Sequence, residues 1–586
     1  METLGSTNVV CSDKTGTLTK NEMTVVALYT AGGEIWEVGG SGYAPEGEIR
    51  LGSRPLVLEE SPELRELLTA ASLCNDARLL PPGPEQPRWS ISGDPTEGSL
   101  LSLAAKAGLW REALEAEYPR RQEVPFDSDV KMMATLHEGP SGKVVYIKGA
   151  PEVILEFCGS YRGSSGESLP LDEVATQRIL REGALLADRA LRLLAFAEVG
   201  GDDADLRAGL EPLRGKARFL GLSGQMDPPR PEARQAVALC RSAGIRPIMV
   251  TGDHKATGLA IARELDIARD GDLALDGREL EALSEDEFRE RLERISVYAR
   301  VYPAQKLRIV RAWQARDAVV AMTGDGVNDA PALAQADVGV AMGLSGTEVA
   351  KAASKIVLTD DNFATIVNAV EEGRLVFRNI RKTLLYLFST SLSEIVILFF
   401  ALVMGWPLPL AAVQILWVNL VTDGMMTIPL IMTPPEGDEM ASKPNPRRAP
   451  ILPPEMLRRM LFMVLAMSSS TLIYYFLKIQ AGTPFEQVRT GVFTLLVVCQ
   501  WFNAVNCLSE SRSAFAKKTL EDYWLWGGLI LGNLLQMAVI FLEPMQSLFH
   551  TAALPWSEAL LIGAAGSLVL WAEELRKWLA RRRLRA

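Results

Sequence analysis

Three polar motifs, far apart in the chain, each follow a short apolar run. Asp13-Lys14-Thr15-Gly16-Thr17 follows residues 8–12, Thr251-Gly252-Asp253 follows residues 245–250, and the sequence Thr-Gly-Asp-Gly-Val-Asn-Asp at residues 323–329 follows residues 318–322. The motifs share carboxylates, hydroxyls and glycine turns, which are groups that bind Mg²⁺ and phosphate oxygens. Their composition therefore indicates chemistry on a phosphate group.

The residue types fit the transfer of a phosphoryl group to a carboxylate. A carboxylate is a weak nucleophile toward a polyanion, so the phosphate charge must be neutralised and the attack aligned. We expect Asp13 to be the nucleophile, with its carboxylate and the Thr15 carbonyl on Mg²⁺. Asp325 would supply the second oxygen ligand that this hard cation prefers.

Other polar residues of the motifs would position the phosphate. Asn328 and Asp329 would orient the metal ligand from the next turn. Thr251 and Gly252 can hydrogen-bond phosphoryl oxygens, and Lys306 is placed to balance their charge. Each fragment alone could be an ordinary glycine turn. Three fragments in this order, each after an apolar run, favour one catalytic site.

The apolar runs before the motifs are short enough to be buried strands. Helical stretches at residues 231–243 and 306–314 lie between and after them. Alternation of strands and helices is typical of a parallel sheet, in which ligands bind beyond the carboxyl ends of the strands. The sequence therefore predicts that the three motifs meet at one edge of such a sheet.

The last third of the chain is apolar enough to lie in a membrane. The 586 residues are 48% hydrophobic and 23% charged, which indicates several domains and too apolar a composition for a wholly soluble chain. A helix needs roughly 20 apolar residues to cross a bilayer. The alternative is a soluble protein with long buried helices. We predict six spans, at residues 384–404, 410–432, 456–477, 491–508, 524–542 and 554–571.

Charge patterning orients these spans. Lys and Arg are concentrated beside alternate ends of the spans, for example at Arg378, Arg447, Lys517 and Arg581. This bias predicts that these ends, and the soluble part of the chain before the spans, lie in the cytosol. The net charge of −11 argues against a nucleic-acid partner. The six cysteines lack paired spacing, so neither a disulfide framework nor a zinc site is expected.

Four polar residues fall inside the predicted spans, where polar groups are costly and usually functional. Glu394 lies in the first span, and Asn419, Thr422 and Asp423 lie in the second. All four offer oxygen ligands, which suit a hard cation such as Ca²⁺ better than copper or zinc. The alternatives are Mn²⁺, Na⁺ or H⁺, or a hydrogen-bond network between helices that binds no ion.

The motifs at residues 13–17, 251–253 and 323–332, with Asp227-Pro228-Pro229-Arg230, resemble those of P-type ATPases, most closely the calcium-pump branch of type II. The resemblance covers nearly the whole chain. It implies an α/β haloacid dehalogenase-like phosphorylation domain at residues 1–26 and 219–376. An α+β nucleotide-binding domain would be inserted at residues 27–218, and an all-α membrane domain of six helices would follow at residues 377–586.

The resemblance also implies ATP and Mg²⁺ as cofactors and Ca²⁺ as the transported cation. The protein would be a multi-pass membrane protein of a prokaryotic plasma membrane. The implied catalytic residues are Asp13, Lys14, Thr15, Thr251, Gly252, Asp253, Lys306, Asn328 and Asp329, with Mg²⁺ on Asp13, Thr15 and Asp325.

A nucleotide site is implied by the same resemblance. Lys148, in Lys148-Gly149-Ala-Pro-Glu, would lie beside the adenine, and Phe126 would stack on it. Lys131 would be a nearby basic contact, Glu97 an acid near the base, and Arg192 an arginine that reaches the phosphates. Without the resemblance, Phe126 would be read as a core residue and Lys131 as a solvated surface charge.

The chain departs from the two-site calcium pumps in two ion-site positions. Ser391 stands where they carry asparagine, and Gln500 stands where they carry glutamate. One of the two ion sites is therefore expected to be lost, which predicts one Ca²⁺ transported per ATP.

The larger departure from the family pattern is at the N-terminal end of the sequence. Family members have an actuator domain and four more membrane helices before the segment that matches this chain. Met1 stands where relatives often have valine, which indicates a GTG codon read as a start inside a longer or broken gene, or a separately encoded N-terminal half. We expect a phosphoenzyme formed on this chain alone to decay slowly. Two other readings remain open: a soluble-type phosphatase, and a silent fragment that is a structural partner of another membrane subunit.

Overall fold

The computed structural model describes residues 2–84, 86–163, 167–510 and 512–585. Met1, on which the start-codon expectation rests, lies outside these ranges. The chain forms two compact units, one made of Asn8–Val367 and the other of Met1–Thr7 with Asn368–Ala586.

A seven-stranded sheet carries the three polar motifs. All its neighbouring strands are parallel, and the three predicted strands are its centre, in the order β15-β1-β18. Strands buried on both faces read as continuous apolar runs, as these do. In sheet order the strands are β16 (Leu273–Asp276), β17 (Ile295–Ala299), β15 (Arg246–Thr251), β1 (Val9–Asp13), β18 (Val320–Gly324), β19 (Val338–Met342) and β20 (Ile356–Leu358).

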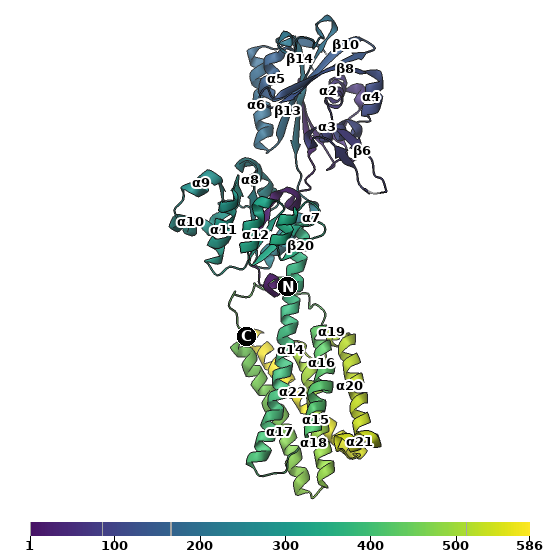
Figure 1. The fold of residues 1–586 in the computed structure, drawn as a ribbon, viewed down its shortest axis with the longest axis vertical. Helices are drawn as coiled ribbons and strands as arrows, with labels where there is room; N and C mark the ends of the chain where they lie inside the picture. The colour runs from purple at the N-terminus through teal and green to yellow at the C-terminus, as the bar shows by residue number, and fades with distance from the viewer. Residues whose placement is uncertain (1, 85, 164–166, 511, 586) are drawn as a thin grey trace. The chain divides into compact units, whose positions relative to one another are not determined.

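Helices connect these parallel strands, as a parallel order requires. Both predicted helices are present, as α7 (Pro231–Ser242) and α11 (Pro303–Gln314), and each begins with a proline, whose fixed φ suits the first helical turn. α8 (Lys255–Glu264) follows β15, and α12 (Ala330–Gln335) follows β18. Figure 1 shows these helices around the sheet. The helix that begins at Pro303 places Lys306 in its first turn.

A second, larger sheet occupies the segment before α7. Its main path, β5-β4-β3-β2-β14-β13-β10-β9-β8, is antiparallel. α2 (Pro62–Leu73) and α3 (Pro95–Lys106) cover one face, and α5 (Pro151–Phe157) and α6 (Glu173–Asp188) cover the other (Figure 1). The strands that matter below are β2 (Thr24–Thr30), β8 (Arg120–Asp127), β9 (Met132–Gly139), β10 (Gly142–Gly149), β13 (Arg192–Gly200) and β14 (Ala217–Met226).

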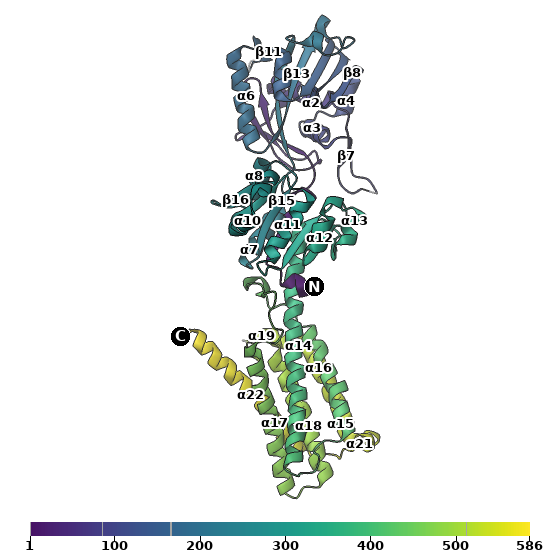
Figure 2. The same ribbon diagram turned by 60° about the vertical axis from the view of Figure 1, so that its left-hand side comes forward.

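The second unit is helical. Among the described residues, five segments are long and apolar enough to cross a membrane: α14 (Phe363–Val403), Ala412–Ile431, α17 (Pro454–Gln480), α18 (Phe485–Cys507) and α20 (Tyr523–Phe541). The segment Ala412–Ile431 consists of α15 (Ala412–Trp417), a π turn (Val418–Thr422) and α16 (Asp423–Ile431). α17, α18 and α22 run side by side (Figure 2).

Two of the predicted spans differ from the helices observed. The predicted span 384–404 is the C-terminal half of α14, because the polar residues before it continue the same 41-residue helix. The predicted span 554–571 lies in α22 (Trp556–Arg585). α22 falls outside the five membrane-spanning candidates, so six spans are not confirmed by length and composition alone.

Candidate functional site

The three polar motifs meet at the carboxyl edge of the parallel sheet. Asp13 is the last residue of β1, Thr251 is the last residue of β15, and Thr323 is the second-to-last residue of β18. The backbone N–H of Asp13 donates to the hydroxyl of Thr323 over 2.9 Å, although the two residues are 310 positions apart. One site is therefore assembled from distant segments, as the strand pattern predicts.

A cluster of three carboxylates lies at this edge. Asp13, Asp325 and Asp329 each place one oxygen within 4.8 Å of the others. Lys306 bridges two of them, because its ammonium lies 2.6 Å from Asp329 and 3.2 Å from Asp13. An all-oxygen donor set of this kind fits Mg²⁺, with Asp13 and Asp325 as ligands.

The surroundings perturb the charges of this cluster. Burial raises the pKa of Asp13, as do the charges of Asp329 and Asp325, whereas Lys306 lowers it. Burial likewise raises the pKa of Asp325. Burial opposes the charge of Lys306, but Asp13 and Asp329 outweigh it and raise the pKa of the ammonium. Concentrated negative charge in a poorly solvated site favours a bound cation.

The turn after Asp13 is shaped by its glycine. Gly16 has a φ of 75°, a left-handed conformation that glycine adopts without strain, and Thr15 just before it is extended. Arg230 donates to the carbonyls of Gly16 and Thr19 over 3.0 and 3.1 Å. The turn is thus held from outside by the segment at residues 227–230.

Lys14 and Asp227 form a second charged group beside the turn. Lys14 is buried, and its ammonium lies 2.5 Å from a carboxylate oxygen of Asp253 and 4.0 Å from one of Asp227. Asp227 also accepts hydrogen bonds from the Thr19 hydroxyl and the Glu22 backbone. Asp227 and Arg230 stand outside the predicted site residues. Both residues belong to the motif Asp227-Pro228-Pro229-Arg230. From the sequence, this motif supported only the family resemblance and was assigned no role in the site.

The other predicted residues of the site differ in exposure. The hydroxyl of buried Thr251 accepts the backbone N–H of Asp253 over 3.0 Å. Gly252 is exposed, and a side chain there would meet only open space, so a ligand can approach its backbone closely. Asp329 is buried and accepts the backbone N–H groups of Asp325 and Gly326, whereas Asn328 is exposed on the same turn.

In the larger sheet, the predicted nucleotide residues lie at one end of neighbouring strands. Lys148 is 4% exposed and pairs with Glu97 at 2.5 Å. Gly149 lies against the chain at Lys131, where a β-carbon would come within 2.4 Å of the Lys131 carbonyl. Gly149 pairs with Met132 of β9 and with Ala195 of β13. Lys131 and Arg192 therefore lie at the same end of the sheet as Gly149.

Phe126 lies near the end of β8, the edge strand beside β9. Its side chain is 58% exposed, which excludes the alternative that it is a core residue. It lines a shallow pocket with Val124, Met132 and Leu210. An exposed aromatic ring, with cationic side chains at the same end of the sheet, can stack on a flat heterocycle.

In the helical unit, three of the four predicted ion ligands, Glu394, Asn419 and Thr422, are linked by hydrogen bonds that run through Gln500. Glu394 accepts the amide of Asn419 over 3.1 Å and that of Gln500 over 3.0 Å. The Thr422 hydroxyl donates to the carbonyls of Val418 and Gln500. The π turn at Val418–Thr422 disturbs the regular helix here, as π turns at functional sites often do.

Asp423 is held by two residues that sequence reasoning missed. Tyr386 and Thr390 of α14 donate to its two carboxylate oxygens over 2.8 and 3.2 Å. Both donors are buried, as is Asp423. Their spacing of four residues places them on one face of α14, but only the tertiary contact reveals their partner.

The sheet topology, the carboxylates at its edge and the apolar helices define an integral membrane protein with a haloacid dehalogenase-like part. Family profiles agree. Residues 63–232 match a profile described as P-type ATPase, cytoplasmic domain N, and residues 407–579 match cation transporting ATPase, C-terminus. Residues 148–337 and 307–370 match haloacid dehalogenase-like hydrolases.

Similar proteins carry related names. The chain is 40% identical to a calcium-transporting ATPase of Bacillus subtilis over 96% of its own length and 63% of the relative's. It is 42% identical to the cation-transporting ATPase pma1 of Synechocystis, over 95% and 62% of the two chains. It is 34% identical to a calcium-transporting ATPase type 2C member 1 of Bos taurus, over 98% and 59%.

The chain belongs to the P-type cation-transporting ATPases. It spans about 63% of the length of the bacterial calcium-transporting relative named above.

Proposed function

We propose that this chain is the catalytic and C-terminal membrane part of an ATP-driven cation pump that works through an aspartyl phosphate on Asp13. The observation that carries the proposal is the position of Asp13. Its carboxylate lies at the end of the central strand, beside Lys306 and within 4.8 Å of two further carboxylates. In the reaction, an Asp13 oxygen bonds to the γ-phosphorus, the bond to the ADP oxygen breaks, and water later cleaves the acyl phosphate.

The residues around Asp13 have distinct roles in this proposal. Asp13 and Asp325 hold Mg²⁺, which neutralises phosphate charge when bound. Lys306 balances the charge of Asp13 and Asp329. Thr251 and Gly252 donate to the phosphoryl oxygens through a hydroxyl and a backbone N–H. The Thr323 hydroxyl and Arg230 are positioning groups, since they hold the nucleophile strand and its turn.

We assign ATP binding to the larger sheet within residues 27–218. Phe126 stacks on the adenine, and Lys148, fixed by Glu97, lies beside it. Lys131 and Arg192 supply cations at the same sheet edge, where the phosphates of ATP carry negative charge. Residues 1–26 and 219–376 then form the phosphorylation domain, and residues 377–586 form the membrane domain.

The transported cation in this proposal is Ca²⁺. Glu394, Asn419, Thr422 and Asp423 offer only oxygen ligands, and three of them are buried in the helical unit. Several of the similar proteins are named calcium-transporting ATPases. The distribution of Lys and Arg at the helix flanks supports a cytosolic location for the ATP-binding part.

Phosphorylation of Asp13 is tested with radiolabelled ATP and Mg²⁺. The protein should form a phosphoenzyme that is stable in acid and cleaved by hydroxylamine, because an acyl phosphate has this reactivity. Asp13→Asn should abolish the label, since the amide is not a nucleophile. Asp270→Asn, at an exposed position remote in sequence from the motifs, is the matched control and should label normally. Label that persists in Asp13→Asn would place the phosphate on another residue.

A further inference from the structure

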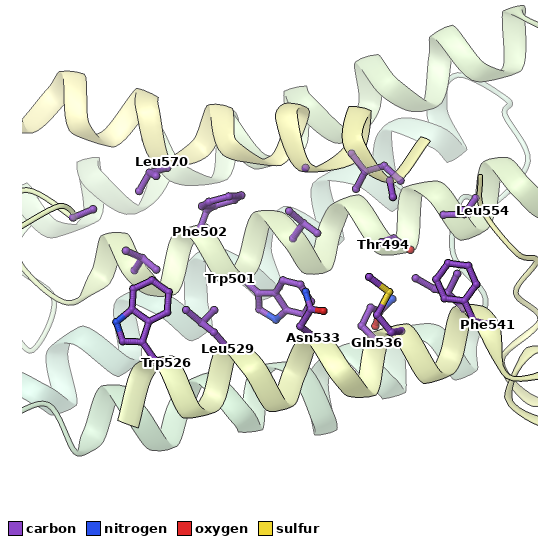
Figure 3. Close-up of a pocket in the computed structure, with 18 of the residues that line it drawn as sticks. Thr494, Trp501, Phe502, Trp526, Leu529, Asn533, Gln536, Phe541, Leu554 and Leu570 are labelled. Carbon is purple, nitrogen blue, oxygen red and sulfur yellow. The ribbon is translucent and has the colours of Figure 1, made fainter. Parts of the chain in front are cut away.

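An apolar groove lies between three helices of the membrane unit, and none of the four predicted ion ligands lines it. α20 packs on α16 and α18, whereas α22 packs on α17 and α18, and a cavity of about 490 Å³ is left between them. Figure 3 shows its lining, which is rich in large apolar and aromatic side chains. These include Trp501, Phe502, Trp526, Leu529, Phe541 and Leu570.

Two hydrogen-bond donors in this lining lack partners within the described part of the chain. Gln536 is 2% exposed, and its carbonyl accepts the Trp417 ring N–H over 3.2 Å, but its amide Nε2 has no acceptor. The buried ring Nε1 of Trp501 has none either. Buried donors without acceptors are costly, and the cost is greatest in apolar surroundings.

The donors lie near the middle of α20 rather than at its ends. Trp501 Nε1 faces Gly532, where a β-carbon would come within 3.4 Å of it, and Gly532 is one helical turn from Gln536. Asn533 also lines the groove, three residues from Gln536 and on the same face (Figure 3). The groove is therefore lined mainly by apolar side chains, with two unpaired donors among them.

This combination excludes two simple occupants. A hydrocarbon chain would fill the volume, but it carries no acceptor and would leave both donors unpaired. A water molecule could pair with these donors, but it would leave nearly all of a cavity of about 490 Å³ unfilled. The lining therefore suits a largely apolar molecule that also carries an acceptor, such as a carbonyl oxygen.

We propose that this groove binds a membrane-soluble quinone, a flat ring with carbonyl acceptors and an apolar tail. The ring carbonyls would accept from Trp501 Nε1 and Gln536 Nε2, and the tail would follow the apolar lining. Aromatic side chains pack well against a flat ring. Occupation would join α20 to α18 and α22. The proposal does not depend on the ion or on the aspartyl phosphate.

Equilibrium binding of radiolabelled decylubiquinone to the full chain in phosphatidylcholine nanodiscs tests the proposal. Trp501→Phe keeps the ring but removes the donor, so it should weaken binding by about tenfold, the effect of losing one hydrogen bond in apolar surroundings. Trp524→Phe makes the same change at an exposed position of α20 outside the groove, and it should bind as the unmodified protein does.

A second measurement needs no variant. An azido derivative of the same quinone, cross-linked by light, should label peptides of α18, α20 and α22 that line the groove. Equal affinity in Trp501→Phe and Trp524→Phe, or label on other helices, would overturn the proposal.

Discussion

Lys306 lies between two carboxylates that would repel one another without it. Its ammonium contacts Asp13 and Asp329, and both contacts are largely buried. Their charges raise the pKa of the ammonium against the effect of burial, which favours its charged form. In the proposed reaction, Asp13 therefore approaches the phosphate beside a positive charge.

Lys306→Met should slow phosphoenzyme formation by about 10²- to 10³-fold, the usual cost of removing one group that stabilises transition-state charge. The apolar side chain fills similar space but leaves the two carboxylates uncompensated. The rate is measured by quenching the reaction with radiolabelled ATP in acid. Lys351→Met, which removes only an ion pair with the exposed Glu348, should react at the normal rate. Equal rates in the two variants would show that Lys306 has no part in charge balance.

The loop between β19 and α13 (Glu348–Ala353) depends on one carboxylate that follows β20. Asp361 accepts the backbone N–H groups of Gly343, Leu344 and Ser345, and it is nearly buried. Burial alone would raise its pKa, but these hydrogen bonds outweigh burial and lower it. This loop precedes Thr347, whose backbone N–H donates to the carbonyl of Asp325, so the Asp361 carboxylate indirectly supports the proposed phosphate site.

Asp361→Asn should lower the free energy of unfolding by about 2 kcal/mol, because charge-assisted hydrogen bonds become neutral ones. Asparagine tolerates the left-handed backbone at this position, where φ is 51°. Because the folded pKa of Asp361 is lowered, its stabilisation is complete above the ordinary value of about 4 and is lost as pH falls through the folded value. The difference between unmodified and variant protein should therefore shrink in acid.

Thermal unfolding of both proteins at several pH values measures this difference. Asp360→Asn is the matched control, because the neighbouring Asp360 is exposed and bonds only locally, to Asn362 and Thr365. It should cost much less and show little dependence on pH in the same range. A constant difference between pH 7 and pH 3 for Asp361→Asn would contradict the assigned role of the carboxylate.

Hydrogen bonds among the predicted ion ligands and Gln500 link three helical segments of the membrane unit. Gln500 of α18 donates its amide N–H to Glu394 of α14 and accepts from Thr422 of the π turn. A glutamate at position 500 would add a negative charge here, whereas glutamine adds none. Hard-cation affinity depends strongly on how many ionised oxygens face the ion. In the proposed transport, the glutamine at position 500 therefore weakens one of the two cation sites.

If the proposed transport holds, the protein should bind one Ca²⁺ for each phosphorylation site. Asp423→Asn should abolish ion-dependent phosphorylation, and Glu394→Gln should weaken it less, since Gln500 and Asn419 remain beside it. The double variant Ser391→Asn with Gln500→Glu should recover a second ion. Equilibrium binding of radioactive calcium, normalised to phosphoenzyme, measures the ratio. Two ions per site in the unmodified protein would refute the charge argument.

Local patterns in the sequence determined the class of fold and the core of the site. The apolar runs before Asp13, Thr251 and Asp325 predict strands, and a glycine-rich turn after each predicts a site at the strand ends, because both signals lie within a few residues. The five confirmed spans were likewise readable, since length and apolar composition are local properties. A role for Lys306 in balancing phosphate charge was expected from its residue type, but its contact with Asp13 was not predicted.

Only the tertiary structure decided which distant groups touch. Thr323 supports Asp13 from 310 residues away, and Tyr386 and Thr390 hold Asp423 from another helix. The groove with its unpaired Trp501 and Gln536 depends on how α18, α20 and α22 pack. Such contacts leave no periodic trace, because hydrogen bonds and voids between helices depend on the relative position of whole elements rather than on residue spacing along one of them.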